Sequence, residues 1–309
     1  MAERRIKVGT RGSALALWQA NWVIRELCAA VPEVSCDIEV IRTTGDRNQD
    51  VPLPAVGAQG VFVAELEAAL ADGRVDLAVH SAKDLPTAIA PGMTLAAFLL
   101  REDAHDVLVS HKYPTLADLP AGARIGTGSF RRVAQLRAHD RSWRFEDLRG
   151  NLDTRLAKLE HQDLDGIVLA AAGLKRLGLA DRITAPIPMA VCLPAVGQGA
   201  VAVEIRSADT ELAGWLQAID DAATRAAVLA ERALLRTLQG GCQAPIGAHA
   251  RLFGEHLQLE AIVAALDGSK VLRKVMEGPM AKPDVLGERL GQELLSLGAH
   301  DLMGARSAT

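Results

Sequence analysis

The sequence is poor in aromatic residues and has no long apolar run, and each shortage excludes a class of protein. Aromatic residues make up 3% of the 309 residues, so the 49% of hydrophobic residues must build cores mainly from alanine, leucine, valine and isoleucine. The longest apolar runs, such as residues 261–266, are too short to cross a bilayer. The first residues, Met-Ala-Glu-Arg-Arg-Ile-Lys-Val, lack the apolar centre of a signal peptide. We therefore expect a cytoplasmic protein with no membrane partner.

Charge and cysteine usage exclude further classes. The net charge of −4 argues against a general nucleic-acid binder, so no nucleic-acid partner is expected. No Cys-x-x-Cys or His-x-x-x-His spacing occurs, so neither a protein-bound metal nor a redox dithiol is expected. Cys28 and Cys36 fall on helical and strand patterns and are expected to fill space, whereas the pattern assigns no role to Cys192.

Cys242 lies in a segment where glycine and proline prevent regular structure. A helical pattern over residues 222–238 ends at Gly240-Gly241, and Pro245 keeps the chain from returning to a helix. A thiol on such a loop can reach a ligand, and it is a strong nucleophile where cationic neighbours lower its pKa. The alternative is a small residue at a helix end, because free cysteine usually behaves as a buried hydrophobe.

The first two thirds of the chain alternate short apolar strands with amphipathic helices, which is typical of α/β domains. Strands are predicted at residues 4–8, 36–41, 75–79, 106–110, 124–126, 143–145, 166–170 and 200–205. Helices are predicted from Leu15 onward and at residues 61–71, 152–159, 171–177, 212–219 and 222–238. Antiparallel strands at residues 248–252, 257–265 and 270–276, with Asp267-Gly268 as a hairpin turn, precede a helix at 285–297. This length suits two or three domains, with a new unit starting near residue 101.

Several arginines fall where a predicted strand gives way to a helix. The segments Gly9-Thr10-Arg11-Gly12-Ser13 and 126–132 both place glycine and hydroxyl residues before a helix, with Ser13 as a candidate N-cap. Two arginines in a first helical turn oppose the helix dipole unless anions are present, and such a departure marks a functional site. We expect these arginines to meet at one sheet edge, where they bind a ligand with several carboxylates: Arg11, Arg131, Arg132, Arg149, Arg155 and Arg176. Phosphates are the alternative, although no phosphate-binding loop motif is present.

Two other segments have the composition of a binding site. The strand at 75–79 runs into His80-Ser81-Ala82-Lys83-Asp84, so one of Lys83 and Asp84 is expected to face a crevice; a surface ion pair is the alternative. Residues 42–60 are rich in glycine, proline and polar residues without an apolar period, which predicts a lid or binding loop.

Five motifs in this order resemble those of the porphobilinogen deaminase family, which is also called hydroxymethylbilane synthase. They are Val79-His80-Ser81-Ala82-Lys83-Asp84, Gly126-Thr127-Gly128-Ser129-Phe130-Arg131-Arg132, Leu148-Arg149-Gly150-Asn151, Leu193-Pro194-Ala195-Val196-Gly197-Gln198-Gly199 and Gly240-Gly241-Cys242-Gln243-Ala244-Pro245. The resemblance implies two doubly wound α/β domains like those of periplasmic binding proteins, at residues 1–99 with 200–217 and at 105–193. A small α+β C-terminal domain at residues 222–309 would carry the cofactor cysteine.

The resemblance also implies the chemistry: a monomeric transferase of tetrapyrrole (heme and porphyrin) biosynthesis. It would join four porphobilinogen molecules head to tail on a dipyrromethane cofactor held by a thioether to Cys242, releasing ammonia and then, by hydrolysis, the linear hydroxymethylbilane. Asp84 would hold pyrrole N–H groups, stabilise the azafulvenium-like cation left by loss of ammonia, and transfer protons. The residues expected to bind cofactor and substrate are Arg11, Ser13, Ser81, Lys83, Thr127, Ser129, Arg131, Arg132, Arg149, Asn151, Arg155, Arg176, Gln198 and Gly199.

The sequence departs from the family pattern in the lid and near the second arginine motif. Gln59 stands where the family usually has lysine, while Phe62 is retained, and Gly128 and Phe130 replace the commoner serine and leucine. These departures concern the binding of carboxylates by the lid rather than the reaction.

Two other functions share parts of this pattern. A non-enzymatic anion-binding protein would use the α/β domains but has no need of Cys242. A cysteine hydrolase needs a base beside the thiol, and His249 is the only histidine close to Cys242 in sequence. Reaction of the protein with Ehrlich's reagent separates all three, because only the deaminase carries bound pyrroles.

Overall fold

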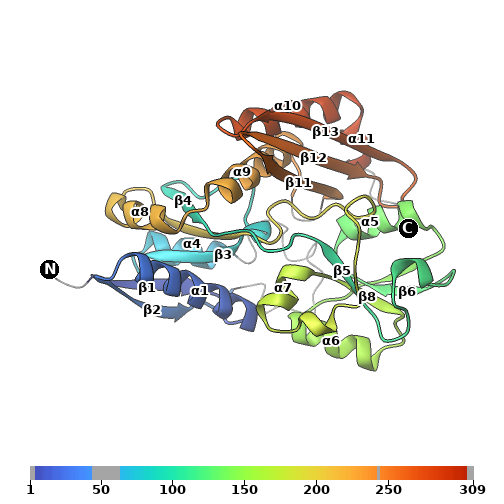
Figure 1. Cartoon of the computed structure of the whole chain (residues 1–309), viewed down its shortest axis with the longest axis horizontal. Coiled ribbons are helices and arrows are strands. Elements are labelled where there is room, and N and C mark those ends of the chain that lie inside the picture. Colours follow the sequence, from blue (N-terminus) through green and yellow to red (C-terminus); the bar gives the residue numbers. More distant parts are fainter. Residues whose placement is uncertain (1–3, 44–62, 242–243, 305–309) are drawn as a thin grey trace. The chain divides into compact units, whose positions relative to one another are not determined.

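The computed structural model describes residues 4–43, 63–241 and 244–304, which form three β-sheets (Figure 1). Cys242, Gln59, Phe62 and most of the predicted lid lie outside the described residues. The chain divides into two compact units, residues 1–102 with 200–225 and residues 103–199 with 226–309.

The first unit is built on a mixed five-stranded sheet in the order β2-β1-β3-β10-β4. Its strands are β1 (Arg4–Thr10), β2 (Val34–Val40), β3 (Leu77–Ser81), β4 (Met93–Phe98) and β10 (Val201–Arg206). β1 runs parallel to β2 and β3, whereas β10 is antiparallel to β3 and β4.

Successive side chains of a strand point to opposite faces of the sheet, so this sheet has apolar side chains on both faces, and helices cover both. Leu77 and Val79 share a core with α1 (Ala14–Ala30) and α8 (Thr210–Leu216), which the short η4 (Gln217–Ile219) follows. Ala78, between them, packs with α4 (Ala64–Ala71). The short turn η1 (Ala82–Asp84) follows β3 directly and places Asp84 at the end of that strand.

The second unit contains a second mixed sheet, in the order β7-β6-β8-β5-β9. Its strands are β5 (Asp106–Val109), β6 (Arg124–Gly126), β7 (Arg144–Glu146), β8 (Gly166–Ala170) and β9 (Ala185–Pro186). Helix α5 (Phe130–His139) packs on one face through Leu136, and α6 (Leu152–His161) and α7 (Ala171–Arg176) pack on the other. Short 3₁₀ turns η2 (Leu116–Asp118) and η3 (Ala180–Arg182) lie in its connections.

The same unit holds a three-stranded antiparallel sheet of β11 (Ile246–Phe253), β12 (His256–Ala264) and β13 (Val271–Pro279). The helices α9 (Ala222–Thr237) and α10 (Pro283–Ser296) share its apolar core, and α11 (Ala299–Gly304) ends the described chain. Figure 1 shows α10 lying along this sheet.

These sheets confirm the predicted class of two α/β sheets followed by a small α+β part. The predicted strand at 75–79 was displaced by two residues, because the Val75 N–H bonds the Ala69 carbonyl in the turn after α4. Strands β4 and β9 were missed; β4, Met-Thr-Leu-Ala-Ala-Phe, contains alanines, which have low β-propensity. No helix among the described residues combines the length and apolarity needed to cross a membrane.

The contact between α9 and α10 requires a glycine. A Cβ added to Gly287 of α10 would lie 2.2 Å from the Ala230 carbonyl oxygen and 2.7 Å from the Ala233 Cβ of α9. Gly287→Ala should therefore force the helices apart and lower the free energy of unfolding by about 1–3 kcal/mol, the usual cost of overpacking.

Gly214 provides the matched control, because it lies in helix α8 and a Cβ there meets nothing within 4 Å. Gly214→Ala should stabilise the protein by up to about 1 kcal/mol, because alanine loses less conformational freedom in a helix. Denaturant unfolding of both variants tests this account. Equal stability of Gly287→Ala and the wild type would show that the two helices are not held at backbone contact.

Candidate active site

In the first unit, the predicted site residues follow two neighbouring parallel strands. Arg11 and Ser13 come after β1, and Lys83 and Asp84 come after β3. Because β1 and β3 are parallel, these segments lie at one edge of the sheet. Ser13 caps α1 as predicted, since its Oγ accepts a hydrogen bond of 3.3 Å from the Ala16 N–H.

The end of β3 is fixed by buried polar contacts. The Ser81 hydroxyl accepts a hydrogen bond of 2.9 Å from the Gln19 amide of α1. One residue earlier, His80 Nε2 lies 2.9 Å from Glu204 Oε2 of β10, and both side chains are buried. The members of this pair are 124 positions apart, so no local pattern in the sequence indicates it. Together these contacts hold the strand that presents the half-buried Asp84.

In the second unit, three parallel strands end at a common edge, and most of the remaining predicted residues follow them. Thr127 and Ser129 come after β6, Arg149 and Asn151 after β7, and Arg176 lies in the helix after β8. Arginines thus follow strand ends within this unit, but the six predicted arginines do not share one sheet edge, because Arg11 follows β1 of the other sheet. Contacts with the backbone hold two of them, since Arg155 Nε donates to the Gly150 carbonyl at 2.8 Å and Arg176 Nη2 to the Gly199 carbonyl at 2.7 Å.

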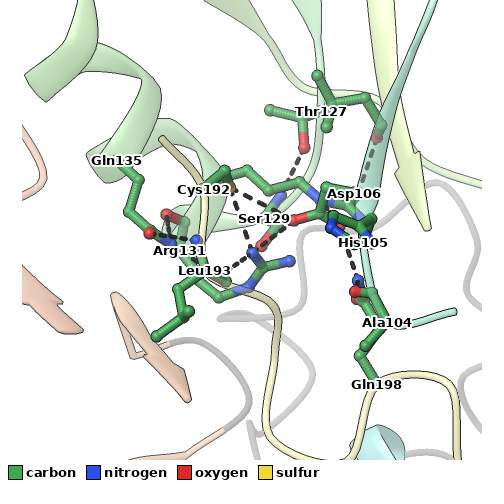
Figure 2. Close-up of polar contacts among 12 residues, drawn as sticks. Ala104, His105, Asp106, Thr127, Ser129, Arg131, Gln135, Cys192, Leu193 and Gln198 are labelled. Atoms are coloured by element: carbon green, nitrogen blue, oxygen red, sulfur yellow. Dashed lines mark hydrogen bonds and ion pairs between the residues drawn. The ribbon is translucent and has the colours of Figure 1, made fainter. Parts of the chain in front are cut away.

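Arg131 and Arg132, in the first turn of α5, are buried against a single carboxylate. Arg131 Nη1 lies 2.6 Å from Asp106 Oδ2, and Arg132 Nη2 lies 2.7 Å from Asp106 Oδ1. Figure 2 shows Asp106 with Arg131. The Asp106 carboxylate therefore supplies part of the negative charge that stabilises two arginines at the N-terminus of α5.

The Asp106 carboxylate also organises its other neighbours. Gln198 Nε2 donates to Asp106 Oδ1 at 2.9 Å and to the Ala104 carbonyl at 2.7 Å (Figure 2). Burial alone would raise the pKa of the Asp106 carboxyl, but the guanidinium groups of Arg131 and Arg132 outweigh it and hold that pKa well below its usual range. Asp106 is thus an anion throughout the physiological pH range.

Asp106 is the site residue that sequence reasoning missed. Its signal was an acidic residue as the first member of β5, whose other residues, 107–109, are apolar. Its position also explains Cys192, whose Sγ lies 3.3 Å from Asp106 Oδ2. Burial and the adjacent carboxylate raise the pKa of the Cys192 thiol to about 12, so this cysteine is a hydrogen-bond donor and not an activated nucleophile.

The two remaining described cysteines lie together in the first unit, with their sulfur atoms 3.9 Å apart. Burial and the neighbouring Cys28 raise the pKa of Cys36 to about 12. These observations agree with the prediction that Cys28 and Cys36 fill space.

Comparison with known proteins accounts for nearly the whole chain. Residues 6–214 match the family model "Porphobilinogen deaminase, dipyromethane cofactor binding domain", and residues 225–296 match "Porphobilinogen deaminase, C-terminal domain". The porphobilinogen deaminase of Desulforudis audaxviator is 50% identical over 97% of this chain and 97% of its own length. That of Moorella thermoacetica is 50% identical over 96% of this chain and 95% of its own length.

Solved structures of substrate-binding proteins are more distant. The methionine-binding protein MetQ is 13% identical, with a TM-score of 0.44 over 70% of this chain and 89% of its own. The periplasmic VFT2 domain of Bordetella pertussis BvgS is 14% identical, with a TM-score of 0.42 over 70% and 86%. These scores are too low to support an inference about ligands. The family models and the curated relatives, by contrast, extend over both units, and on them rests the conclusion that this chain belongs to the porphobilinogen deaminase family.

Proposed function

We propose that this chain is a porphobilinogen deaminase, a transferase of tetrapyrrole biosynthesis. In this proposal it condenses four porphobilinogen molecules on a dipyrromethane cofactor attached to Cys242, releases ammonia at each step and finally releases hydroxymethylbilane by hydrolysis. The family model that covers residues 6–214 names the dipyrromethane cofactor, and membership of the family is the observation that carries the proposal.

The residues of the second unit suit a ligand with several carboxylates. Two guanidinium groups, Arg131 and Arg132, face the single carboxylate of Asp106, so the cluster keeps a positive charge. Arg131 Nε is buried and has no hydrogen-bond partner among the described residues, although a buried donor is costly to leave unpaired. The Ser129 hydroxyl, at the start of α5, makes no capping bond. An acetate or propionate group would satisfy these donors.

Arg131 and Arg132 take different parts in this proposal. All three nitrogens of the Arg132 guanidinium point at protein groups, with Nε and Nη2 donating to Asp106 and Nη1 to the Val168 carbonyl. We therefore infer that Arg131 donates directly to a ligand carboxylate, whereas Arg132 contributes its charge and holds Asp106. Ser129, Thr127, Arg149, Asn151, Arg155, Arg176, Gln198 and Gly199 complete the proposed carboxylate-binding set of this unit.

Asp84 is the proposed catalytic residue. When bound, the dipyrromethane supplies the pyrrole carbon to which new units are joined. The Asp84 carboxylate holds pyrrole N–H groups and stabilises the positive charge that develops when ammonia leaves the substrate. Arg11, Ser13, Ser81 and Lys83, from the same sheet edge, are proposed to bind substrate carboxylates, with Gln59 and Phe62 in the lid.

The proposal includes three domains: residues 1–99 with 200–217, residues 105–193, and residues 222–309. Its support is that each range forms its own sheet and most of a hydrophobic core. Family membership is the support for two further parts of the proposal, namely that the chain acts as a monomer and works in the cytoplasm.

Cys242→Ser should remove cofactor attachment and leave the fold intact, because only a sulfur at this position forms the thioether. Intact-protein mass and Ehrlich's reagent measure the result. The wild type and the control Cys28→Ser should carry the extra mass of two pyrrole units and give the coloured reaction, and Cys242→Ser neither. Equal extra mass in all three proteins would place the attachment elsewhere.

Asp84→Asn should keep the cofactor but lose turnover, because an amide cannot balance the charge that develops on the pyrrole. Removal of one such electrostatic group typically lowers kcat on the order of 10²–10³-fold. Asp72→Asn, an exposed aspartate of the same unit, is the matched control and should retain wild-type turnover. Near-normal turnover of fully loaded Asp84→Asn would contradict the catalytic role.

A further inference from the structure

Glu231 is an acidic residue in the interior of the second unit for which neither the motifs nor the proposed reaction gives a role. It lies in the middle of α9, and its side chain is fully buried. Ala227 and Leu234, one turn away on the same helix, and the adjacent Ala230 belong to the apolar core. A carboxylate in such surroundings costs several kcal/mol unless hydrogen bonds meet its charge.

Both oxygens of Glu231 accept hydrogen bonds from the backbone, and the two donors belong to different segments. Oε2 accepts from the Gly197 N–H at 2.7 Å, and Oε1 accepts from the Ala250 N–H of β11 at 2.8 Å. Short bonds of this kind to a carboxylate are roughly twice as strong as bonds between neutral groups. His249 Nδ1 lies 3.7 Å from Oε1, beyond hydrogen-bond distance.

The pairing of β11 explains why a carboxylate is needed at this point. Its partner β12 occupies one edge of the strand, and residues 193–197 follow the other edge, where the Ala248 N–H bonds the Pro194 carbonyl at 3.0 Å. Gly247 admits this close approach, since a Cβ there would lie 2.7 Å from the Leu193 carbonyl oxygen. Two residues further along β11, the Ala250 N–H on that same edge bonds Glu231 instead.

These contacts join the segments on either side of Cys242 to one loop. Helix α9 precedes Cys242 and carries Glu231, whereas β11 follows Cys242 and carries Ala250. The loop that contains Gly197 also contains Leu193 and Gln198. Leu193 accepts a hydrogen bond of 2.7 Å from Arg131 Nη1, and Gln198 donates to Asp106.

We propose that Glu231 is a positioning residue, which fixes both flanks of the cysteine segment to the loop 193–199 and thereby to the Arg131–Asp106 cluster. This role rests on the proposed function, because it concerns where the cofactor-bearing segment is held. Glu231 itself contacts no substrate in this proposal. It acts by holding two backbone amides that no other side chain of the described structure is shown to hold.

Amide hydrogen exchange in the full-length protein, resolved by residue, tests the contacts directly. Glu231→Gln has one acceptor oxygen in place of two and turns an N–H donor toward a backbone N–H. Exchange at Gly197, Ala250 or both should therefore accelerate on the order of 10–100-fold, the range expected for loss of a bond to a charged group. Wild-type exchange rates at both amides in this variant would overturn the proposal.

Loading and kinetics separate positioning from general stability. Leu290→Val is the control, because Leu290 lies in the same core on α10 and the change lowers stability without touching the contacts of Glu231. The Glu231→Gln protein should carry less cofactor, or its kcat should fall about tenfold or more while KM stays within about twofold. The reason is that a small misplacement of a reacting group lowers the rate strongly. Glu231→Asp, one methylene shorter, should give the same pattern and replaces Glu231→Gln if that variant does not fold.

The outcomes distinguish this inference from the proposed function. If Leu290→Val, at equal loss of stability, reproduces the loading and kcat of the Glu231 variants, Glu231 has only a structural role and the proposal is overturned. If the wild type carries no pyrroles and has no deaminase activity, the proposed function fails and this role falls with it. The exchange data would then identify the contacts of Glu231 as purely structural.

Discussion

The second unit depends on the ion pairs and hydrogen bonds of the buried Asp106 carboxylate. This carboxylate accepts hydrogen bonds from Arg131 and Arg132 at the start of α5 and from Gln198 in the loop 193–199. Each charge would be costly in this interior without the others, so removal of one partner should strongly destabilise the group. Because two cations meet one anion, the completed cluster also keeps a positive charge at a helix N-terminus, where an incoming carboxylate is stabilised.

The loop 193–199 connects the Asp106 cluster to the segments on either side of Cys242. On one side Leu193 pairs with Gln135 of α5, whose Oε1 accepts from the Leu193 N–H at 2.7 Å. On the other side the loop runs along β11 and ends against Glu231. Two buried carboxylates on distant parts of the sequence, Glu231 and Asp106, thus accept hydrogen bonds from the adjacent loop residues Gly197 and Gln198. The second α/β sheet and the C-terminal sheet are joined through this loop by directional bonds as well as by apolar packing.

Features that depend on neighbouring residues, such as caps and strand ends, could be predicted from the sequence. Contacts between residues distant in the sequence could not, because the topology of the sheets defines them. Ser13 was predicted because helix N-caps have a local sequence signature. The position of Lys83 and Asp84 after a strand was predicted because an apolar run stops just before them. Asp106 was missed because its partner Gln198 is 92 positions away, a pairing that only the folded sheet defines. The same reason explains the His80–Glu204 pair, since β10 inserts between β3 and β4 from a distant part of the chain. For Cys242, the glycines beside it predicted only an exposed thiol, and its role in cofactor attachment came from the resemblance to the family.

In the proposed reaction, one chain builds a polypyrrole on Cys242 with the single carboxylate of Asp84. Mass spectra of the intact protein, mixed with limiting porphobilinogen and quenched during turnover, test it most directly. We expect discrete covalent species heavier than the loaded protein by one, two, three and four pyrrole units. Product release should leave the two-unit cofactor on Cys242. A single jump to the fully extended species would contradict stepwise growth, and loss of the cofactor with each product molecule would contradict its permanent attachment.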